Sequence, residues 1–150
     1  MRIMLRKILV ELYERDLGKL KEEIGQYTDE PDLWKTSEGI SNSAGNLCLH
    51  VSGNLNHFFG AVLGNNGYVR DRDAEFANKN ASRGDMLADI DATRHVVLST
   101  LAQLTEEDFD KPYPIEVFGQ PMTTGYFLTH LTTHFNYHLG QINYHRRLVA

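Results

Sequence analysis

The sequence contains a single cysteine, Cys48, so no disulfide can form within one chain. It also lacks any apolar run that approaches the ~20 residues needed to cross a bilayer. The apolar start of the chain is short and soon meets Glu11 and Glu14, which argues against a secretory signal. These absences predict a protein of a reducing compartment, and we expect it in the cytoplasm with no membrane partner.

Positive charge is also scarce. The chain has 15 Lys and Arg against 20 Asp and Glu, which gives a formal net charge of −5. A general nucleic-acid-binding protein needs a basic face to offset phosphate repulsion, and no predicted helix carries a basic stripe. We therefore expect no nucleic-acid partner.

What the chain does contain is four long stretches of helical periodicity, in which apolar residues recur at spacings of three and four. Serine hydroxyls that suit the N-cap precede the second and third stretches, and Asp85 stands in capping-box position after Ser82. The stretch Gly64-Asn65-Asn66-Gly67 stops the second helix. The predicted helices are Leu5 to Ile24, Ser41 or Ser43 to Val62, Ser82 to Leu104, and about Thr123 to Leu148.

The segments between these helices are poor in helical signal. Residues 26–39 contain Pro31, residues 68–80 read as a long connection, and residues 105–121 hold three of the four prolines, with room for a short extended piece. No repeat or linker divides the chain, so residues 1–150 are predicted to form one all-α domain, a four-helix bundle. Long connections can carry crossovers, so simple up-down-up-down order does not follow from the pattern.

Four of the seven histidines lie in one short stretch, LTHLTTHFNYHLGQINYH, at residues 128–145. At 100° per residue they fall, with Gln141, within one arc of about 80° on the last helix. Leu131 and Phe135 lie beside that arc, so the imidazoles border the apolar stripe and do not occupy the fully wet face. The four histidines are His130, His134, His138 and His145.

The second predicted helix repeats this arrangement, because His50, Asn54 and His57 form a polar stripe beside its apolar residues. Histidines at i and i+4 share a helix face and can both reach one divalent ion at about 2.0–2.1 Å. Three in a row cannot, since His130 and His138 are about 12 Å apart along the axis. A mononuclear site would therefore take one adjacent pair from the last helix and one ligand from the second.

If these two helices run antiparallel, two combinations are in register. His50 can meet His134 and His138, or His57 can meet His130 and His134, and spacing does not choose between them. A third possibility is a polar layer of hydrogen-bonded histidines without a metal. No Glu stands three residues before any histidine and no H-E-x-x-H occurs, which excludes ferritin-like and zincin sites. Nitrogen ligands without a carboxylate in sequence favour Zn²⁺ or Ni²⁺ over Ca²⁺ or Mg²⁺.

Other polar residues are open to two interpretations each. Gln141 and Asn54 lie one turn beyond predicted ligands and could orient a ligand or substrate, or could make ordinary helix contacts. Arg70 and Arg72 could clamp a substrate carboxylate or phosphate, or could form salt bridges that fix the connection to a helix end. Cys48 is turned away from His50 on the helix and is predicted to be buried in the core.

The octapeptide HFNYHLGQ, residues 134–141, resembles the H-x-x-x-H-x-G-Q signature on the last helix of the DinB-like proteins, the YfiT/DinB superfamily. LCLHVSGNLNHFFG resembles their second helix, which supplies one further histidine, and SRGDMLADIDATRHVVLSTLAQLTEEDF resembles their third. The likeness covers essentially the whole chain. GNNGYVRDRDAEF departs from the simpler members of the family and looks like a subgroup feature.

The resemblance implies a four-helix bundle in up-down-down-up order, often dimeric, with one divalent ion near one end. It assigns His50, His134 and His138 as metal ligands, and it sets aside His57 and His130. Relatives include metal-dependent transferases and isomerases that use bacillithiol, mycothiol or glutathione. The function expected from the resemblance is thus a thiol transferase or a related hydrolase that acts on a small electrophile. The alternative is a non-enzymatic stress-response binding protein with a structural or vestigial metal.

Overall fold

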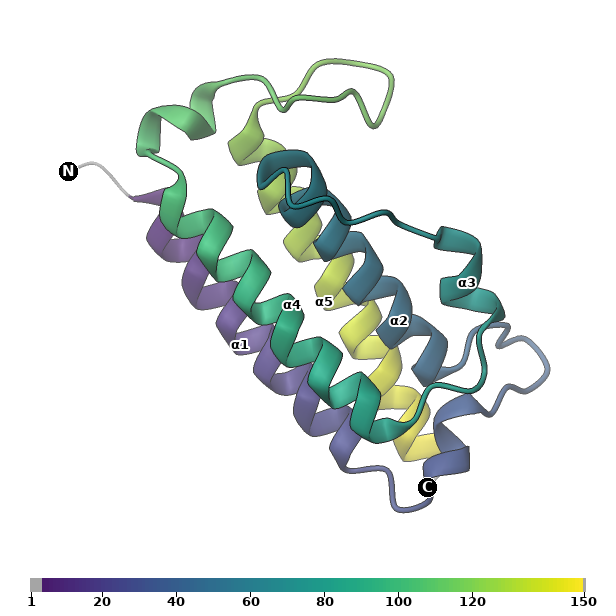
Figure 1. Ribbon diagram of the computed structural model, residues 1–150. Coiled ribbons are helices and arrows are strands. Elements are labelled where there is room, and N and C mark those ends of the chain that lie inside the picture. Colours follow the sequence, from purple (N-terminus) through teal and green to yellow (C-terminus); the bar gives the residue numbers. More distant parts are fainter. Residues whose placement is uncertain (1–3, 150) are drawn as a thin grey trace.

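Four long helices pack side by side in the computed structural model, which describes residues 4–149 (Figure 1). The second of them continues without interruption into a π-helical segment, here called η2. A short helix, α3, lies beside α2. The elements are α1 (Leu5–Gly25), α2 (Ala44–Leu55), η2 (Asn56–Leu63), α3 (Arg72–Ala77), α4 (Arg83–Gln103) and α5 (Thr124–Val149), with 3-10 turns at Glu30–Trp34 and Glu106–Asp110.

The predicted N-caps are present. The Ser43 hydroxyl accepts a hydrogen bond from the Asn46 amide and so begins α2, while Ser82 accepts from the Asp85 amide and begins α4. Among the described residues a complete capping box occurs elsewhere, at Thr105 before the second 3-10 turn. The helix starts therefore follow from short-range hydrogen bonds that the sequence makes visible.

Contacts between the helices define their directions. Near its start α1 meets α5 through the Tyr13 hydroxyl, which donates to the Leu128 carbonyl at 2.8 Å. Near its end it meets the end of α5 through the Glu23–Arg146 ion pair, so these two helices are parallel. Lys21 pairs with Asp91, early in α4, so α4 runs antiparallel to α1.

The second helix is parallel to α4 and antiparallel to α5. Asn56 donates to Thr93 and the Phe59 carbonyl accepts from Thr100, while Phe58 packs edge-on against Phe127 at 4.9 Å between ring centroids. The chain after η2 must therefore return along the bundle before α4 begins (Figure 1). The order is up-down-down-up, as the family resemblance implied.

Aromatic and aliphatic side chains fill the centre of the bundle. Tyr13 and Phe59 meet edge to face at 5.2 Å between ring centroids, and Phe135 and Leu55 are fully buried with them. Cys48 is buried in the same core, as predicted. None of the described helices has the length and apolar character of a membrane span.

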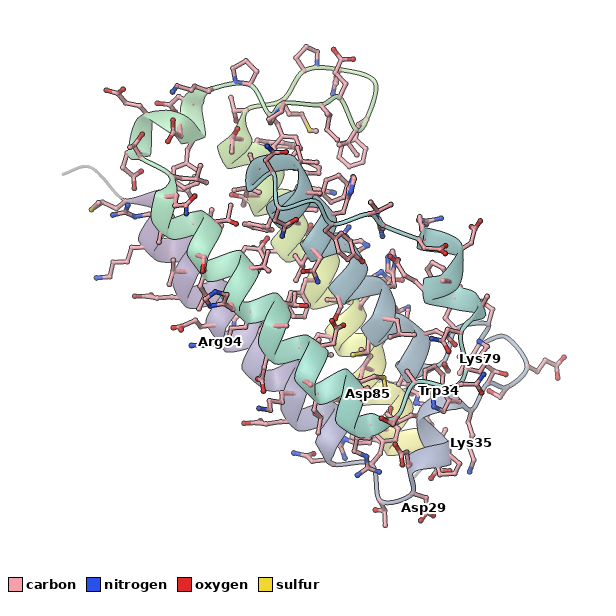
Figure 2. All side chains as sticks on the ribbon, in the orientation of Figure 1. Asp29, Trp34, Lys35, Lys79, Asp85 and Arg94 are labelled. Atoms are coloured by element: carbon pink, nitrogen blue, oxygen red, sulfur yellow. The ribbon has the colours of Figure 1, made fainter. Side chains whose placement is uncertain are left out.

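One end of the bundle is closed by the segment between α1 and α2. Trp34 and Lys35 lie at the end of the bundle near the C-terminus of α5 (Figure 2). A Cβ on Gly45 would lie 2.6 Å from the Trp34 ring, so this glycine lets the indole pack against the first turn of α2. The segment that carries Trp34 is thereby fixed next to α5.

The prediction of an irregular connection at residues 68–80 was wrong in part, because α3 forms within it. The Asp71 carboxylate accepts from the Ala74 amide and caps this helix. Its six residues are too few to show a helical period in sequence. The short extended piece expected in residues 105–121 is reduced to an isolated antiparallel bridge from Pro112 to Thr123, which follows the second 3-10 turn.

Candidate metal centre

Three histidines from two antiparallel helices converge on one point. His50 Nε2, from α2, lies 3.1 Å from His134 Nε2 on α5, and His138 Nε2 lies 3.2 Å from the same atom. Ligand atoms of all three lie within 4.8 Å of one another. The structure thus brings together the set that the family resemblance assigned.

The spacing of these nitrogens suits a metal ion. Ligands at about 2.0–2.1 Å from a tetrahedral ion lie about 3.3–3.4 Å apart, which is close to the two separations of His134 Nε2. Three imidazole nitrogens at this distance repel one another when their lone pairs converge, and a cation between them removes that repulsion. The cluster could therefore hold a metal ion, and its all-nitrogen donor set fits zinc or nickel.

Hydrogen bonds on the far side of two rings fix their tautomers. His50 Nδ1 lies 3.0 Å from Glu75 Oε1, and His138 Nδ1 lies 2.7 Å from Gln141 Oε1. Both partners are oxygen acceptors, so each Nδ1 carries its hydrogen and donates it. The Nε2 lone pairs of His50 and His138 are consequently turned toward His134, as metal ligation requires.

Burial keeps the α5 imidazoles neutral. Desolvation, reinforced by the nearby His138 and His50, lowers the pKa of His134 to about 4. Desolvation also lowers the pKa of His138, against the effect of its hydrogen bond with Gln141. At neutral pH both rings are therefore in the uncharged form that binds a metal.

Glu75 is the functional residue that sequence reasoning missed. It lies on α3, is only 6% exposed, and joins His50 to Arg70, whose Nε and Nη2 donate to its two oxygens at 2.9 and 3.0 Å. Burial opposes ionisation, but the hydrogen bonds from His50 and Arg70 outweigh it and hold the pKa of Glu75 below its ordinary value. The expectation of a histidine site without a carboxylate partner is corrected, since the carboxylate comes from the connection and not from helical spacing.

Gly53 makes the approach of Glu75 possible. It stands one turn after His50 on α2, and a Cβ built on it would lie 1.9 Å from Glu75 Oε2. No other residue fits at this distance without moving the carboxylate. Gly53 is therefore a positioning residue for the Glu75–His50 contact.

The remaining histidines of the two stripes lie outside the cluster. His145 is buried, with its Nδ1 2.7 Å from the Tyr27 hydroxyl and its Nε2 2.8 Å from the Lys35 carbonyl, so both ring nitrogens have partners. His130 packs edge-on against Phe118, and His57 packs against its neighbour Phe58. Of the two registers that the sequence left open, the structure has the one in which His50 meets His134 and His138. His145, whose ring nitrogens are both bonded within the protein, is a structural residue.

Of the other predicted polar residues, two form hydrogen bonds that hold the cluster in place and two have no hydrogen bond to it in the described part of the chain. Gln141 accepts the hydrogen bond of His138 Nδ1. Arg70 forms a salt bridge with Glu75, so the salt-bridge interpretation of this arginine is the one that the structure has. Arg72, the first residue of α3, is exposed and lies over the Phe76 ring at 5.5 Å. Asn54 is buried, and its Oδ1 has no hydrogen-bond partner within residues 4–149.

Two cavities lie near the cluster. A small one, about 200 Å³, is lined by His50 and His134 together with Asn54, Arg70 and Arg72. A larger one, about 650 Å³, lies between residues 39–42 and the second half of α5, with Tyr137 and Gln141 but none of the three histidines in its wall. The small cavity therefore reaches two of the three histidines directly, and the larger one reaches only Gln141, the partner of His138.

A protein family described as "Protein of unknown function (DUF1572)" matches residues 7–150. The chain belongs to this family. Two solved structures are similar to this family member. A DinB-like protein from Bacillus cereus has 16% sequence identity and a TM-score of 0.74, over 93% of this chain and 89% of that one. A conserved protein from Enterococcus faecalis has 18% identity and a TM-score of 0.77, over 99% of this chain and 98% of that one. At these identities the likeness shows the fold, and the DinB-like fold is confirmed. No curated protein matches the chain significantly.

Proposed function

We propose that the protein binds one divalent ion, Zn²⁺ or Ni²⁺, through His50, His134 and His138. The convergence of three Nε2 atoms at 3.1 and 3.2 Å carries this proposal. The hydrogen bonds from Glu75 and Gln141 to the outer ring nitrogens support it, because they hold two tautomers in the ligating form.

We further propose that the ion serves a reaction. Structural zinc sites are closed by four protein ligands, whereas three ligands beside a cavity are typical of catalytic sites. When bound, the ion supplies Lewis acidity, which polarises a substrate and lowers the pKa of water or of a thiol. The residues of this chain orient the imidazoles, through the hydrogen bonds of Glu75 and Gln141 to the outer ring nitrogens.

The reaction we propose is a thiol-dependent transfer to a small electrophile, as the DinB-like resemblance suggests. The larger cavity is within the range of about 300–1,000 Å³ that is usual for small-molecule sites, and it adjoins His138 through Gln141 and Tyr137. We assign it to the low-molecular-weight thiol, such as bacillithiol, mycothiol or glutathione. Homodimerisation and a cytoplasmic location stay predictions.

Metal analysis of variants tests the first step. Purified protein, incubated with Zn²⁺ or Ni²⁺ and desalted, should contain about one ion per chain by ICP-MS, and His134→Ala should contain almost none. His57→Ala is the matched control, because it removes a half-buried histidine that does not reach the cluster. Equal metal content in all three proteins, or loss only in His57→Ala, would overturn the assignment.

Turnover assays test the second step. Metal-loaded protein should consume a thiol in the presence of an electrophile such as monochlorobimane or a halonitrobenzene, and His134→Ala should not exceed the uncatalysed rate. A protein that holds its metal but transfers none of these thiols would be a binding protein with a structural ion.

A further inference from the structure

We propose that the small cavity beside the cluster binds a small carboxylate with a flat apolar body, and that Arg72 holds its carboxylate group. The inference deepens the proposed function and rests on it, because this cavity is the one lined by the ligands His50 and His134 themselves. It names the second substrate, whereas the thiol occupies the larger cavity.

The charge of the lining points to an anion. Arg70 and Arg72 both line this cavity, and its wall contains no Asp or Glu among the described residues. The Nε and Nη2 groups of Arg70 are engaged by Glu75. Arg72 takes part in none of the ion pairs within residues 4–149, and its guanidinium lies over the Phe76 ring. Its guanidinium is thus available to a carboxylate, whose planar geometry it matches with two parallel hydrogen bonds.

A second polar group in the same cavity lacks a partner. Asn54 is 7% exposed and its Oδ1 accepts no hydrogen bond within the described chain. A buried amide in this state costs about 1–3 kcal/mol, so the fold retains it against its own stability. Because Asn54 lines the cavity, a small rotation of its side chain would let a hydrogen-bond donor of the ligand, or an accompanying water, satisfy this oxygen.

The rest of the wall is aromatic and apolar. Phe118 stands edge-on to His130 at 5.0 Å and lies 6.2 Å from Phe127, and all three line the cavity. Rings in this arrangement suit a flat apolar body. The volume of about 200 Å³ equals that of roughly six or seven waters at about 30 Å³ each, so the ligand is the size of one substituted ring.

Calorimetric titration of the zinc-loaded protein tests the site, with benzoate as the probe. Benzamide is the neutral analogue, and inorganic phosphate is an anion without an apolar body. Benzoate should bind and the other two should bind at least about tenfold more weakly. Arg72→Gln should weaken benzoate by about tenfold, which is the effect of losing about 1.4 kcal/mol from a charge-assisted pair.

Arg147→Gln is the matched control. Like Arg72 on α3, Arg147 on α5 is exposed and lies over an aromatic ring, with its guanidinium 5.4 Å from the centroid of the Tyr144 ring. Unlike Arg72, it does not line this cavity. It should leave the affinity for benzoate within about twofold of the unmodified protein. Equal benzoate affinity in Arg72→Gln, equal loss in Arg147→Gln, or binding of benzamide or phosphate as tight as that of benzoate would each overturn the proposal.

Metal content measured on the same samples separates this proposal from the proposed function. Protein that contains one zinc ion per chain and does not bind benzoate retains the metal site and overturns the carboxylate subsite. Protein that contains no metal but binds benzoate through Arg72 overturns the metal assignment and supports the subsite. The two failures are therefore distinguishable.

Discussion

His134 and His145 lie on the same stripe of α5, three turns apart, and the structure gives them opposite roles. Both nitrogens of His145 are satisfied by the protein, through Tyr27 and Lys35. The Nε2 of His134 faces two other imidazole nitrogens. A histidine stripe in a sequence thus indicates where imidazoles lie, whereas the partners of the ring nitrogens indicate what they do.

The largest effect on stability should follow removal of the structural histidine. His145→Ala removes a buried imidazole together with its bonds to the Tyr27 hydroxyl and the Lys35 carbonyl and leaves a cavity, so we expect a loss of about 2–4 kcal/mol in the free energy of unfolding. Urea unfolding measures it. The metal content of the folded variant should not change. A variant as stable as the unmodified protein would remove the distinction between the two histidines.

Gly53→Ala should weaken metal binding without touching a ligand. The added Cβ displaces Glu75 from His50, and loss of such a support typically costs about 10–100-fold in metal affinity. Competition with a chromogenic chelator measures the affinity. Gly18→Ala is the control, because nothing lies within 4 Å of a Cβ at that helical position. An unchanged affinity in Gly53→Ala would show that Glu75 does not support the site.

The metal-free protein should become less stable in acid because of His134. Its folded pKa of about 4 lies below the ordinary value of 6.5, so the unfolded chain binds more protons between these values. This contribution is present above pH 6.5 and is lost as the pH falls toward 4. Urea midpoints in EDTA at pH 7 and pH 5 should differ more for the unmodified protein than for His134→Ala. Equal differences would contradict the lowered pKa.

Gln141→Ala should have the smallest effect of the changes around the cluster. Gln141 is an exposed neutral acceptor for His138, whereas Glu75 is a buried charged acceptor for His50. A neutral exposed hydrogen bond contributes about 0.5–1.5 kcal/mol, so we expect the metal affinity to fall by about tenfold or less. The same chelator assay compares this variant with Glu75→Gln. A greater loss in Gln141→Ala would reverse the ranking of the two supports.

Local patterns made most of the fold predictable. Apolar residues at helical spacing marked the four long helices, and the hydroxyls of Ser43 and Ser82 marked two starts, because these signals depend on neighbours in sequence. The order of the helices came from the family resemblance, since periodicity carries no information on the direction of packing. The six residues of α3 were too few for a period to be visible.

The candidate site was predictable in its imidazoles and, as one of two interpretations each, in Gln141 and Arg70. His134 and His138 share a helix face, and so could be paired from spacing, but the choice of His50 over His57 depended on the resemblance. Glu75 and Gly53 meet 22 residues apart, through the return of the chain after η2, and no local pattern encodes that contact. Whether the Oδ1 of Asn54 has a partner likewise depends on what surrounds it in three dimensions.

The most direct test of the central claim is a crystal structure of the zinc-loaded protein with an anomalous difference map collected above the zinc absorption edge. Our account predicts one strong peak, about 2.0–2.1 Å from the Nε2 atoms of His50, His134 and His138. A peak at His57 and His130, or no peak at any histidine in protein with one bound ion per chain, would contradict it.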